Sequence, residues 1–500
     1  MLHLHTPEQA AQWLRGLVHG HLQSDSRAVR EGDGFLAWVG QTTDARQHVV
    51  QAWQQGAAAC LVEAQGIEAF EAVNDLAMHD VPIACIPQLK ARCGLIADAY
   101  HASPSQQLKM LAVTGTNGKT STVWWLAQAL NRLNEACTVV GTLGLGRPGE
   151  MHSTGLTTPN PLQLHQQLRH WLQQGVRACA IEASSIGLAE HRLEGLKFRT
   201  AIFTNFSQDH LDYHADMHQY WAAKQRLFDW PHLRCAVVNL DDPMAAVLLA
   251  HLKLRPEVKV WTVSMQTLAD IHAEQLQTTA EGVCFEVIEG EQRLSVHSPA
   301  LGDFNVLNLL GVIAALRDLG YSLPSAVKAC QGLQAVPGRM QRVGKPQQPA
   351  VVVDYAHTPD AVDKALRALR PWAHARGGRL VCILGCGGNR DSSKRAPMAR
   401  MAEQAADLVC LTSDNPRDED PQEIMAQMCL GLTRPQAAWQ WVDRGQAIAH
   451  VIAQARAEDI VLIAGKGHET YQEIQGVKHG FSDVDHAELA LHKWGVACTA

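Results

Sequence analysis

The stretch Val113-Thr114-Gly115-Thr116-Asn117-Gly118-Lys119-Thr120 decides the fold of this chain. It is a compressed form of the phosphate-binding pattern G-x-x-x-x-G-K-[ST]. The apolar residues 108–113 predict a buried strand, and residues 121–133 predict a helix. Because this motif occurs between a strand and a helix, the sequence predicts a phosphate-binding loop here. The alternative, an ordinary glycine turn, does not explain the Lys-Thr pair that follows.

The residue types of this loop suit a nucleoside triphosphate. Gly115 and Gly118 would let backbone N–H groups approach phosphate oxygens, and the start of the following helix adds partial positive charge. Lys119 would neutralise the terminal phosphates, and the Thr120 hydroxyl would hold a magnesium ion. The loop is therefore expected to bind phosphate groups together with Mg²⁺ as the cofactor.

Composition indicates a water-soluble, multidomain chain. A length of 500 residues is too great for one core, so roughly two to four domains are expected. The net charge of −7, without a basic block, argues against nucleic acid or an anionic membrane as a partner. Residues 1–20 lack the apolar core of a signal peptide, and no apolar stretch is long enough to span a membrane. We expect no membrane insertion.

The cysteines indicate a reducing compartment. Their number, 13, is odd and their spacing irregular, which favours reduced thiols in a cytoplasmic protein. Cys382 and Cys386 lie close together, but no second pair accompanies them. We interpret them as small core residues at a strand end, not as zinc ligands.

The chain divides into three composition blocks, and the fold class predicted is α/β. We expect a smaller N-terminal α/β domain over 1–103, a central domain over 104–336 and a C-terminal Rossmann-like domain over 337–500. The central domain should be a P-loop-type, mostly parallel sheet with helices on both faces and a β-rich excursion at 269–299. Further predicted strands are 138–141, 178–182, 200–204, 236–239, 350–354, 379–384, 408–412 and 460–464, and a further helix is 304–319.

Polar residues follow two central strands. Glu182 ends a strand, where a carboxylate beside a phosphate loop could bind Mg²⁺ or merely begin a helix. The His- and Asp-rich loop 205–214 follows the strand 200–204 and is typical of an active site. His210, His214 and His218 are four residues apart, so the spacing alone allows either a zinc site or ordinary histidines.

Glycine and proline loops follow three strands of the C-terminal block. The first is 385–391 with Arg390, the second Asp414-Asn415-Pro416-Arg417, and the third Gly465-Lys466-Gly467-His468-Glu469. The guanidinium and amide groups suit a carboxylate, and Glu469 suits an ammonium group. Together the loops predict one site for a zwitterionic ligand.

These motifs together resemble the Mur ligase family of peptidoglycan synthesis, in order, over residues from about 24 to 470. Within the family they are most similar to ligases that add meso-diaminopimelate to UDP-MurNAc-L-Ala-D-Glu. Other matching stretches are Thr157-Thr158-Pro159, Glu182–Ser185, Ala222-Ala223-Lys224, Gly302-x-Phe304-Asn305-Val306-x-Asn308, Pro337-Gly338-Arg339 and Asp354-Tyr355-Ala356-His357.

The resemblance implies an ATP-dependent amide ligase. The D-glutamate γ-carboxylate attacks the γ-phosphate of ATP to give an acyl phosphate, and the amine of diaminopimelate then displaces phosphate. The N-terminal domain would hold UDP, the central domain ATP and the C-terminal domain the amino acid. Closure of the last domain would exclude water from the acyl phosphate. A cytoplasmic monomer is expected.

The resemblance also implies residue roles. The catalytic residues are Lys119, Glu182, His210 and Lys224. The ATP site comprises Gly115, Thr116, Asn117, Gly118, Lys119, Thr120, Ser121, Asn305, Arg339, Asp354 and His357, and the UDP-muramoyl-peptide site Ser26, Thr157, Thr158, Ser184 and Arg192. The diaminopimelate site comprises Arg390, Asp414, Asn415, Arg417, Gly465 and Glu469, and the metal ligands are Thr120, Glu182, His210 and Lys224, the last as N6-carboxylysine.

For Lys224, the residue type and the family resemblance lead to different predictions. Taken by itself, this residue of a helical stretch is predicted to be a surface lysine, and only the resemblance makes it a metal ligand after carbamylation. The chain also departs from the family at Ile186, often His, at Glu190, often Gln, and at Gln41-Thr42-Thr43, where a uracil-binding loop is usual. These departures concern the UDP-sugar contacts.

Three other functions are weighed against this one. An L-lysine-adding ligase of the same family would have an acidic or neutral residue in place of Arg417. A folylpolyglutamate-type ligase shares the ATP site but not the loop 414–417 or the N-terminal domain. A nucleotide-binding switch needs no amino-acid site, and the guanine-specifying Asn-Lys-x-Asp is absent from the sequence.

Overall fold

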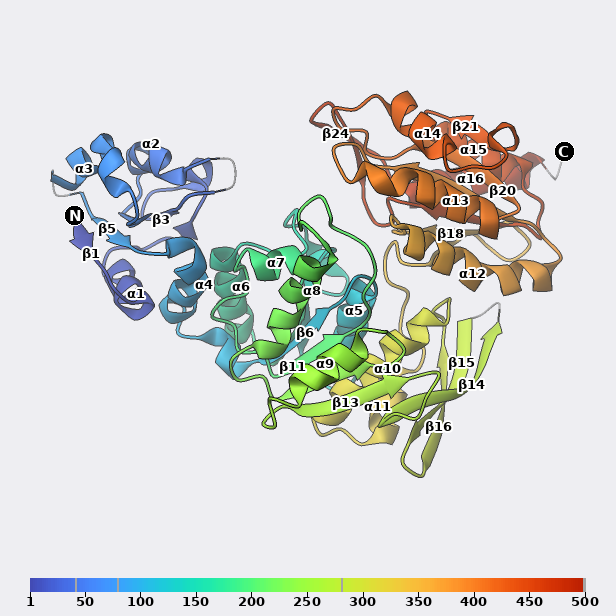
Figure 1. Ribbon diagram of the computed structural model, residues 1–500, viewed down its shortest axis with the longest axis horizontal. Coiled ribbons are helices and arrows are strands. Elements are labelled where there is room, and N and C mark those ends of the chain that lie inside the picture. The colour runs from blue at the N-terminus through green and yellow to red at the C-terminus, as the bar shows by residue number, and fades with distance from the viewer. Residues whose placement is uncertain (41–42, 79–80, 280–281, 498–500) are drawn as a thin grey trace. The chain divides into compact units, whose positions relative to one another are not determined.

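The computed structural model describes residues 1–40, 43–78, 81–279 and 282–497. Strands and helices alternate along the chain, which confirms the α/β class (Figure 1). No helix within the described residues is both long and apolar enough to cross a membrane. The chain forms two compact units: Met1–Thr114, Asn134–Ala201 and Ala223–Ala236 make up the first, and Gly115–Leu133, Ile202–Ala222 and Val237–Ala500 the second.

The first unit begins with a five-stranded parallel sheet. Its order is β1 (Leu2–His3), β5 (Ile83–Ile86), β4 (Ala59–Glu63), β3 (Gly34–Ala37) and β2 (Leu22–Gln23). Leu36 and Leu61 face a core with α1 (Pro7–Arg15) and α4 (Leu89–Tyr100), while Phe35 and Cys60 face a core with α2 (Val49–Gln54) and α3 (Glu71–Met78) (Figure 1). Since both faces are covered, the strands are continuously apolar.

The same unit contains the strand that leads to the phosphate loop. β6 (Lys109–Thr114), β10 (Ala178–Glu182) and β7 (Cys137–Gly141) run parallel with β10 in the middle, and β8 (Gly144–Arg147) and β9 (Glu150–His152) continue antiparallel from β7. The helices α6 (Pro161–Gln173) and α7 (Ser185–Ala189) follow β9 and β10 in the chain. In this register Glu182 pairs with Val113, so the carboxylate lies where both strands end.

The later strands of the predicted central domain match their predicted residue ranges closely. β11 (Thr200–Phe203) and β12 (Cys235–Asn239) lie within about one residue of the prediction, and β12 is preceded in the chain by α8 (Met217–Gln225). β13 (Lys259–Ser264) pairs parallel with β14 (Ile271–Thr279), and β15 (Gly282–Glu289) and β16 (Gln292–Ser298) follow antiparallel. The segment 269–299 is therefore β-rich as predicted, but it extends the sheet from β13 and is not an excursion from it.

The helix after the phosphate loop begins earlier than predicted. α5 spans Lys119–Arg132, whereas the sequence suggested a start at residue 121. Gly118 ends the loop with a φ of +86°, and its carbonyl accepts the Thr122 N–H at 3.0 Å. Lys119 and Thr120 therefore belong to the first helical turn, where N–H groups have no partner within the helix. The other helices here are α9 (Ala245–Leu252), α10 (Phe304–Asp318) and α11 (Leu323–Cys330).

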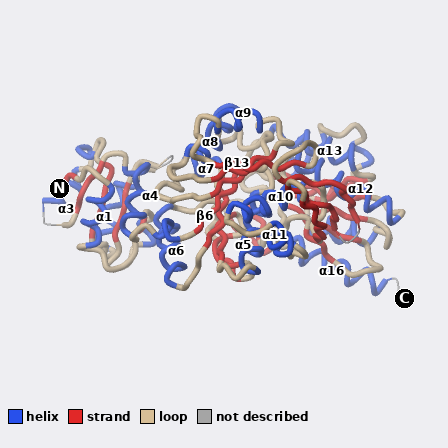
Figure 2. Tube along the Cα trace, turned by 90° about the horizontal axis from the view of Figure 1, so that it is seen from below, coloured by secondary structure: helices blue, strands red, loops and turns tan. Residues whose placement is uncertain are grey.

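The second unit ends in a six-stranded sheet. Its order is β17 (Gln341–Val343), β18 (Ala350–Asp354), β22 (Ile460–Ala464), β19 (Leu380–Cys386), β20 (Leu408–Ser413) and β21 (Trp439–Trp441); only β17 is antiparallel. Alternate side chains face α12 (Pro359–Arg376), α13 (Arg395–Ala405) and α14 (Pro421–Cys429), or α15 (Arg444–Gln454) and α16 (Asp483–Ala497). Figure 2 shows α13 and α16 on opposite sides of these strands. Cys382 and Cys386 are buried in the first of these cores, as predicted.

A buried ion pair joins the ends of two strands of this sheet. Arg444 and Asp483 have fully buried side chains, and Nε and Nη2 of Arg444 donate to the two Asp483 oxygens at 2.7 and 2.8 Å. The guanidinium also donates to the carbonyls of Ser413 at 3.3 Å and Ala464 at 2.9 Å, the last residues of β20 and β22. The guanidinium therefore holds the two strand ends from which these loops begin.

Removal of this guanidinium should destabilise the protein strongly. In Arg444→Met the Asp483 carboxylate stays buried without its cation, which should cost about 3 kcal/mol of unfolding free energy. Urea denaturation of the full chain measures the loss. The control is Arg367→Met, because the exposed Arg367 pairs with Asp363 at the surface and should leave the midpoint unchanged. Equal midpoints for both variants would contradict the bracing role.

Candidate active site

The phosphate loop passes too close to its neighbours for any side chain at Gly115. The φ of Gly115 is +146°, and a Cβ there would lie 2.0 Å from Thr204 Oγ1 and 2.9 Å from the Asn205 carbonyl oxygen. A Cβ on Gly118 would lie 2.4 Å from Asn308 Oδ1. The two predicted loop glycines are thus required by both conformation and space.

The segment after β11 holds the loop in shape. The Thr116 N–H donates to the Asn205 carbonyl at 2.8 Å, and the Asn117 N–H donates to Asn205 Oδ1 at 2.9 Å. Asn205 Nδ2 and Thr204 Oγ1 donate to the Asn117 carbonyl at 3.0 and 2.6 Å. Asn205 was noted in the sequence only as part of a polar loop, and here it acts as the clamp of the phosphate loop.

The charged groups of the loop are turned toward the protein. Lys119 Nζ donates to the carbonyls of Gly115 and Thr116, both at 2.8 Å. The Thr120 hydroxyl accepts a hydrogen bond from Arg339 Nη2 at 3.0 Å. The Arg339 guanidinium in turn lies 4.4 Å over the Tyr355 ring, which fixes its plane.

A cavity of about 90 Å³ lies beside the loop. Asn305 is one of its walls, and its Oδ1 accepts from Asn308 Nδ2 at 3.0 Å. Burial raises the pKa of Asp354, and the Arg339 charge opposes that rise. Predicted site residues on the wall are Asn117, Gly118, Ser121, Asn305, Arg339 and Asp354; residues that the sequence analysis did not assign are Asn205, Asn308, Tyr355 and Lys364.

His210 and His357 flank one carboxylate. The Asp209 Oδ2 lies 3.5 Å from His210 Nε2 and 3.8 Å from His357 Nε2. Burial alone would raise the pKa of Asp209, but His357, His210 and Lys394, together with the His210 backbone N–H, lower it to about 2. Burial also lowers the pKa of His357, whose Nδ1 lies 2.8 Å from the Tyr355 carbonyl. The structure thus brings together two predicted site residues through an aspartate that was not predicted.

Glu182 is a buried carboxylate at the end of β10. It is 1 % exposed, and it accepts hydrogen bonds from the backbone N–H and hydroxyl of Thr142 at 2.8 and 3.2 Å. The Thr142 hydroxyl is also 3.1 Å from the Thr157 hydroxyl. No cationic side chain of the described residues forms an ion pair with Glu182 within 4.0 Å. This leaves a buried negative charge supported only by neutral donors.

The other predicted UDP-side residues of the first unit lie around the Thr157-Thr158 turn. The Thr158 hydroxyl donates to the Glu182 carbonyl and lies 2.9 Å from the Ser184 hydroxyl. Arg192 Nη1 donates to the Thr158 carbonyl at 3.1 Å. Ser26 is buried, and its hydroxyl donates to Gln51 Oε1 at 3.2 Å.

Lys224 and two of the positions that depart from the family pattern lie in the first unit. The prediction from residue type alone that Lys224 lies at the surface is wrong, since its side chain is 1 % exposed within α8. Of the family departures, Glu190 forms an ion pair with Lys90 at 2.6 Å, and Ile186 lies half-buried in α7. Residues 41–42 of the third departure lie outside the described residues.

The three C-terminal loops contact one another. Arg417 has a φ of +52°, donates from Nη1 to the Gly388 carbonyl at 2.7 Å and lies 3.2 Å from the Glu473 carboxylate. Asn415 Nδ2 donates to Glu469 Oε2 at 2.8 Å. A Cβ on Gly465, whose φ is +117°, would lie 2.4 Å from Asp414 Oδ2.

Arg390, from the first of these loops, lies further out. Its side chain is 57 % exposed and its nearest acid is Asp212, at 3.8 Å. Of the residues predicted for these loops, Arg390 lies at the edge of the group, and Glu473 and Lys466, which were not predicted, lie within it.

No three-residue cluster of His, Cys, Asp or Glu suited to a metal ion occurs among the described residues. His214, one of the three evenly spaced histidines, is buried and packs against the Tyr220 ring at 5.3 Å. The zinc alternative for these histidines therefore has no support in the described geometry.

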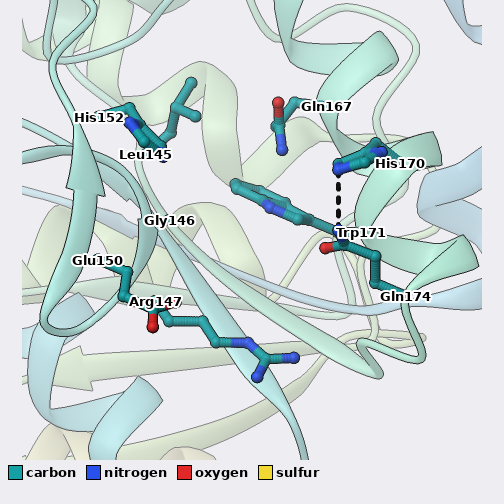
Figure 3. A pocket seen from close by; sticks show the side chains of 9 residues that line it. All are labelled: Leu145, Gly146, Arg147, Glu150, His152, Gln167, His170, Trp171 and Gln174. Atoms are coloured by element: carbon teal, nitrogen blue, oxygen red, sulfur yellow. Dashed lines mark hydrogen bonds between the residues drawn. The ribbon is translucent and has the colours of Figure 1, made fainter.

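A second hollow, of about 400 Å³, lies between the β8–β9 hairpin and α6 (Figure 3). Trp171 lies across its middle, and the one hydrogen bond drawn joins His170 to Gln174 at 2.9 Å. Arg147 and Glu150 on the hairpin place both signs of charge at its rim. It contains none of the predicted site residues.

Comparison with known proteins identifies the family. The sequence pattern of the Mur ligase middle domain matches residues 113–316, and that of the Mur ligase glutamate ligase domain matches residues 338–467. A protein of Acidovorax sp. named UDP-N-acetylmuramoyl-L-alanyl-D-glutamate–2,6-diaminopimelate ligase is 51% identical, with 98% of each chain covered. The chain belongs to the Mur ligase family.

Further relatives agree with this membership. A Pseudomonas aeruginosa protein of the same name is 44% identical over 96% of this chain and 97% of its own. A solved structure of such a ligase is 35% identical and covers 95% of both chains with a TM-score of 0.66. MurF from Acinetobacter baumannii, at 18% identity, 93% and 95% coverage and a TM-score of 0.64, shares the fold.

The loop geometry predicts the effect of one methyl group. Gly115→Ala should weaken binding of a non-hydrolysable ATP analogue by at least about tenfold, because the Cβ would push Thr204 and Asn205 away. Calorimetric titration measures the affinity. Gly320→Ala is the control, since Gly320 has a φ of +95° but nothing within 4 Å of its Cβ position. Equal affinity in both variants would show that the clamp is dispensable.

Proposed function

We propose that this protein is an ATP-dependent, ADP-forming ligase that joins meso-diaminopimelate to the D-glutamate γ-carboxylate of UDP-MurNAc-L-Ala-D-Glu. It would act in the cytoplasm in peptidoglycan precursor synthesis. The relatives named for this reaction support it. The observation that carries the choice of acceptor is Arg417, whose guanidinium donates to the Gly388 carbonyl at 2.7 Å and lies 3.2 Å from the Glu473 carboxylate in the C-terminal loops.

The reaction proceeds in two balanced steps. A γ-carboxylate oxygen attacks the γ-phosphorus of ATP, and the bond from that phosphorus to the bridging β-phosphate oxygen breaks. ADP departs, and the products of this step are ADP and an acyl phosphate. The neutral amine of the acceptor then attacks the acyl carbon, a tetrahedral intermediate forms, and phosphate leaves as the amine loses a proton. Because two anions meet in the first step, positive charge and fixed N–H donors must screen them.

The phosphate loop supplies these groups. The N–H groups of the first turn of α5 would bind the phosphates, together with Lys119. Since Lys119 now donates to two loop carbonyls and the cavity is only about 90 Å³, nucleotide binding requires Lys119 and its neighbours to turn outward. The roles at the nucleotide belong to Gly115, Thr116, Asn117, Gly118, Lys119, Thr120, Ser121, Asn305, Arg339, Asp354 and His357.

The donor set suits a magnesium ion. Glu182 is a buried carboxylate without a cationic partner within 4.0 Å among the described residues, and carboxylate and hydroxyl oxygens are what Mg²⁺ prefers. Thr120, Glu182, His210 and carbamylated Lys224 would hold it. When bound, Mg²⁺ neutralises phosphate charge. Carbamylation needs the neutral amine of Lys224, whose side chain is buried.

The substrates would divide among three domains, 1–103 for UDP, 104–336 for ATP and 337–500 for the amino acid. The family segments 113–316 and 338–467 support the later boundary. Ser26, Thr157, Thr158, Ser184 and Arg192 would contact the UDP-muramoyl peptide. Arg390, Asp414, Asn415, Arg417, Gly465 and Glu469 would contact diaminopimelate. A monomer remains our expectation.

Arg417 distinguishes the two acceptors. Diaminopimelate carries a second carboxylate that a guanidinium can hold through two parallel hydrogen bonds, and L-lysine lacks it. The L-lysine-adding function is the second candidate, because the neighbouring Glu473 carboxylate could accept an ammonium group.

Phosphate release tests this function. We expect release from ATP with UDP-MurNAc-L-Ala-D-Glu to depend on meso-diaminopimelate, and not on L-lysine or on buffer alone. Mass spectrometry of the product should show the new amide. Phosphate release that depends on L-lysine would refute the choice of acceptor. No phosphate release with either amino acid would leave nucleotide binding as the only supported function.

Lys119→Ala should abolish turnover, because the phosphates lose a neutralising ammonium. The same phosphate-release assay measures it, and Lys253→Ala, a change at an exposed lysine, serves as the control. Near-normal activity of Lys119→Ala would refute the ATP-site assignment.

Lys224→Ala should lose activity and regain part of it when short carboxylates such as formate or acetate are added. The added anion would replace the carbamate oxygens. Rates measured with and without carboxylate decide the matter. A Lys224→Ala variant with full activity and no rescue would show that carbamylation is not needed.

A further inference from the structure

Lys466 lies fully buried between two glycines in left-handed conformations. Its side chain is 0 % exposed, and Gly465 and Gly467 have φ values of +117° and +55°. A Cβ on Gly467 would lie 2.7 Å from the Gly338 carbonyl oxygen and 2.8 Å from Tyr355 Cβ. The backbone on both sides of Lys466 is therefore closely confined.

The Lys466 ammonium contacts residues of the proposed amino-acid site. Nζ donates to Glu469 Oε2 at 2.8 Å and to Asn415 Oδ1 at 2.9 Å, and it lies 4.0 Å from Asp414 Oδ1. A buried charge is costly unless it is paired and hydrogen-bonded. These three side chains meet that requirement, so their positions and that of Lys466 depend on each other.

The ammonium fixes the orientation of the Asn415 amide. Asn415 Oδ1 accepts from both Lys466 Nζ and the Glu473 N–H, at 2.9 Å each, so Nδ2 must point the other way. Nδ2 donates to Glu469 Oε2 at 2.8 Å. Oε2 thus receives two hydrogen bonds, while Oε1 receives none from the described residues and the side chain stays 17 % exposed.

The charges of this cluster favour an ammonium ligand. Lys466 carries one positive charge, and Asp414 and Glu469 carry two negative charges, which leaves a net charge of −1. Without Lys466 the two carboxylates would lose the cation that both of them approach, and Asn415 Oδ1 would keep only the hydrogen bond from the Glu473 N–H. The lysine therefore lowers the net charge of the cluster from −2 to −1 and holds the Glu469 carboxylate in place through Oε2.

We propose that Lys466 is a positioning residue that sets the affinity for the acceptor amino acid, acting through Glu469 and Asn415. The proposal rests on the proposed function. Glu469 Oε1 accepts the ammonium group of the acceptor, while Lys466 binds no substrate. Loss of Lys466 weakens binding of the acceptor and does not change binding of ATP or of the UDP-linked substrate.

Steady-state kinetics of the full chain test this role. Lys466→Met should raise the KM for meso-diaminopimelate at least about tenfold and leave the KM values for ATP and UDP-MurNAc-L-Ala-D-Glu within about twofold. The control is Lys478→Met, because that exposed ammonium lies 4.3 Å over the ring of Tyr471, the residue that Lys466 also approaches, at 5.6 Å. An unchanged acceptor KM, or equal rises in all three KM values, would overturn the proposal.

A double variant tests the route through Glu469. Glu469→Gln alone should raise the acceptor KM, and adding Lys466→Met should raise it little further, because both changes act through the same carboxylate. Multiplied effects would overturn the proposal. If Lys466→Met does not fold, Lys466→Gln keeps a neutral donor; it should show a smaller rise in acceptor KM, and a wild-type KM would overturn the proposal.

The wild-type protein separates the two levels of inference. If it releases no phosphate with any acceptor, the proposed function fails and the role of Lys466 fails with it. If it is active with meso-diaminopimelate and Lys466→Met keeps the same acceptor KM, only the role of Lys466 fails.

Discussion

The contact between the phosphate loop and the segment 204–207 is the constraint on which this site depends. The loop must come so near to Asn205 that Gly115 can carry no side chain, and the two N–H groups of Thr116 and Asn117 are then bound by Asn205. The loop N–H groups beyond them, at the start of α5, are left for a ligand. A loop that was looser here would fold those N–H groups onto its own carbonyls.

Buried charges organise the C-terminal loops in a similar way. Arg444 fixes the last carbonyls of β20 and β22, and Lys466 fixes the side chains that follow those strands. Both cations are buried, so each loses more free energy from a misplaced partner than an exposed cation would. The loops therefore lie on a rigid base although they are irregular in conformation.

The sequence predicted the regular elements well, because both faces of each parallel sheet are covered and the strands are continuously apolar. Arg417 and Glu469 were predicted as site residues because polar residues that follow strand ends are easy to recognise in a sequence, and that assignment stays a prediction. The start of α5 was missed because a Lys-Thr pair fits a loop and a first helical turn equally. The sequence did not reveal the structural importance of four polar residues, Asn205, Asn308, Lys224 and Lys466. Whether a polar side chain is buried depends on partners far away in the chain, such as Asn415 for Lys466.

The conformation of Arg417 restricts how this protein can diverge in evolution. With a φ of +52°, the position disfavours β-branched residues whatever the acceptor requires. This position therefore suits unbranched side chains, asparagine or glycine, and a β-branched residue would require the turn to be remodelled. Backbone geometry thus limits which side chains this loop can present to a ligand.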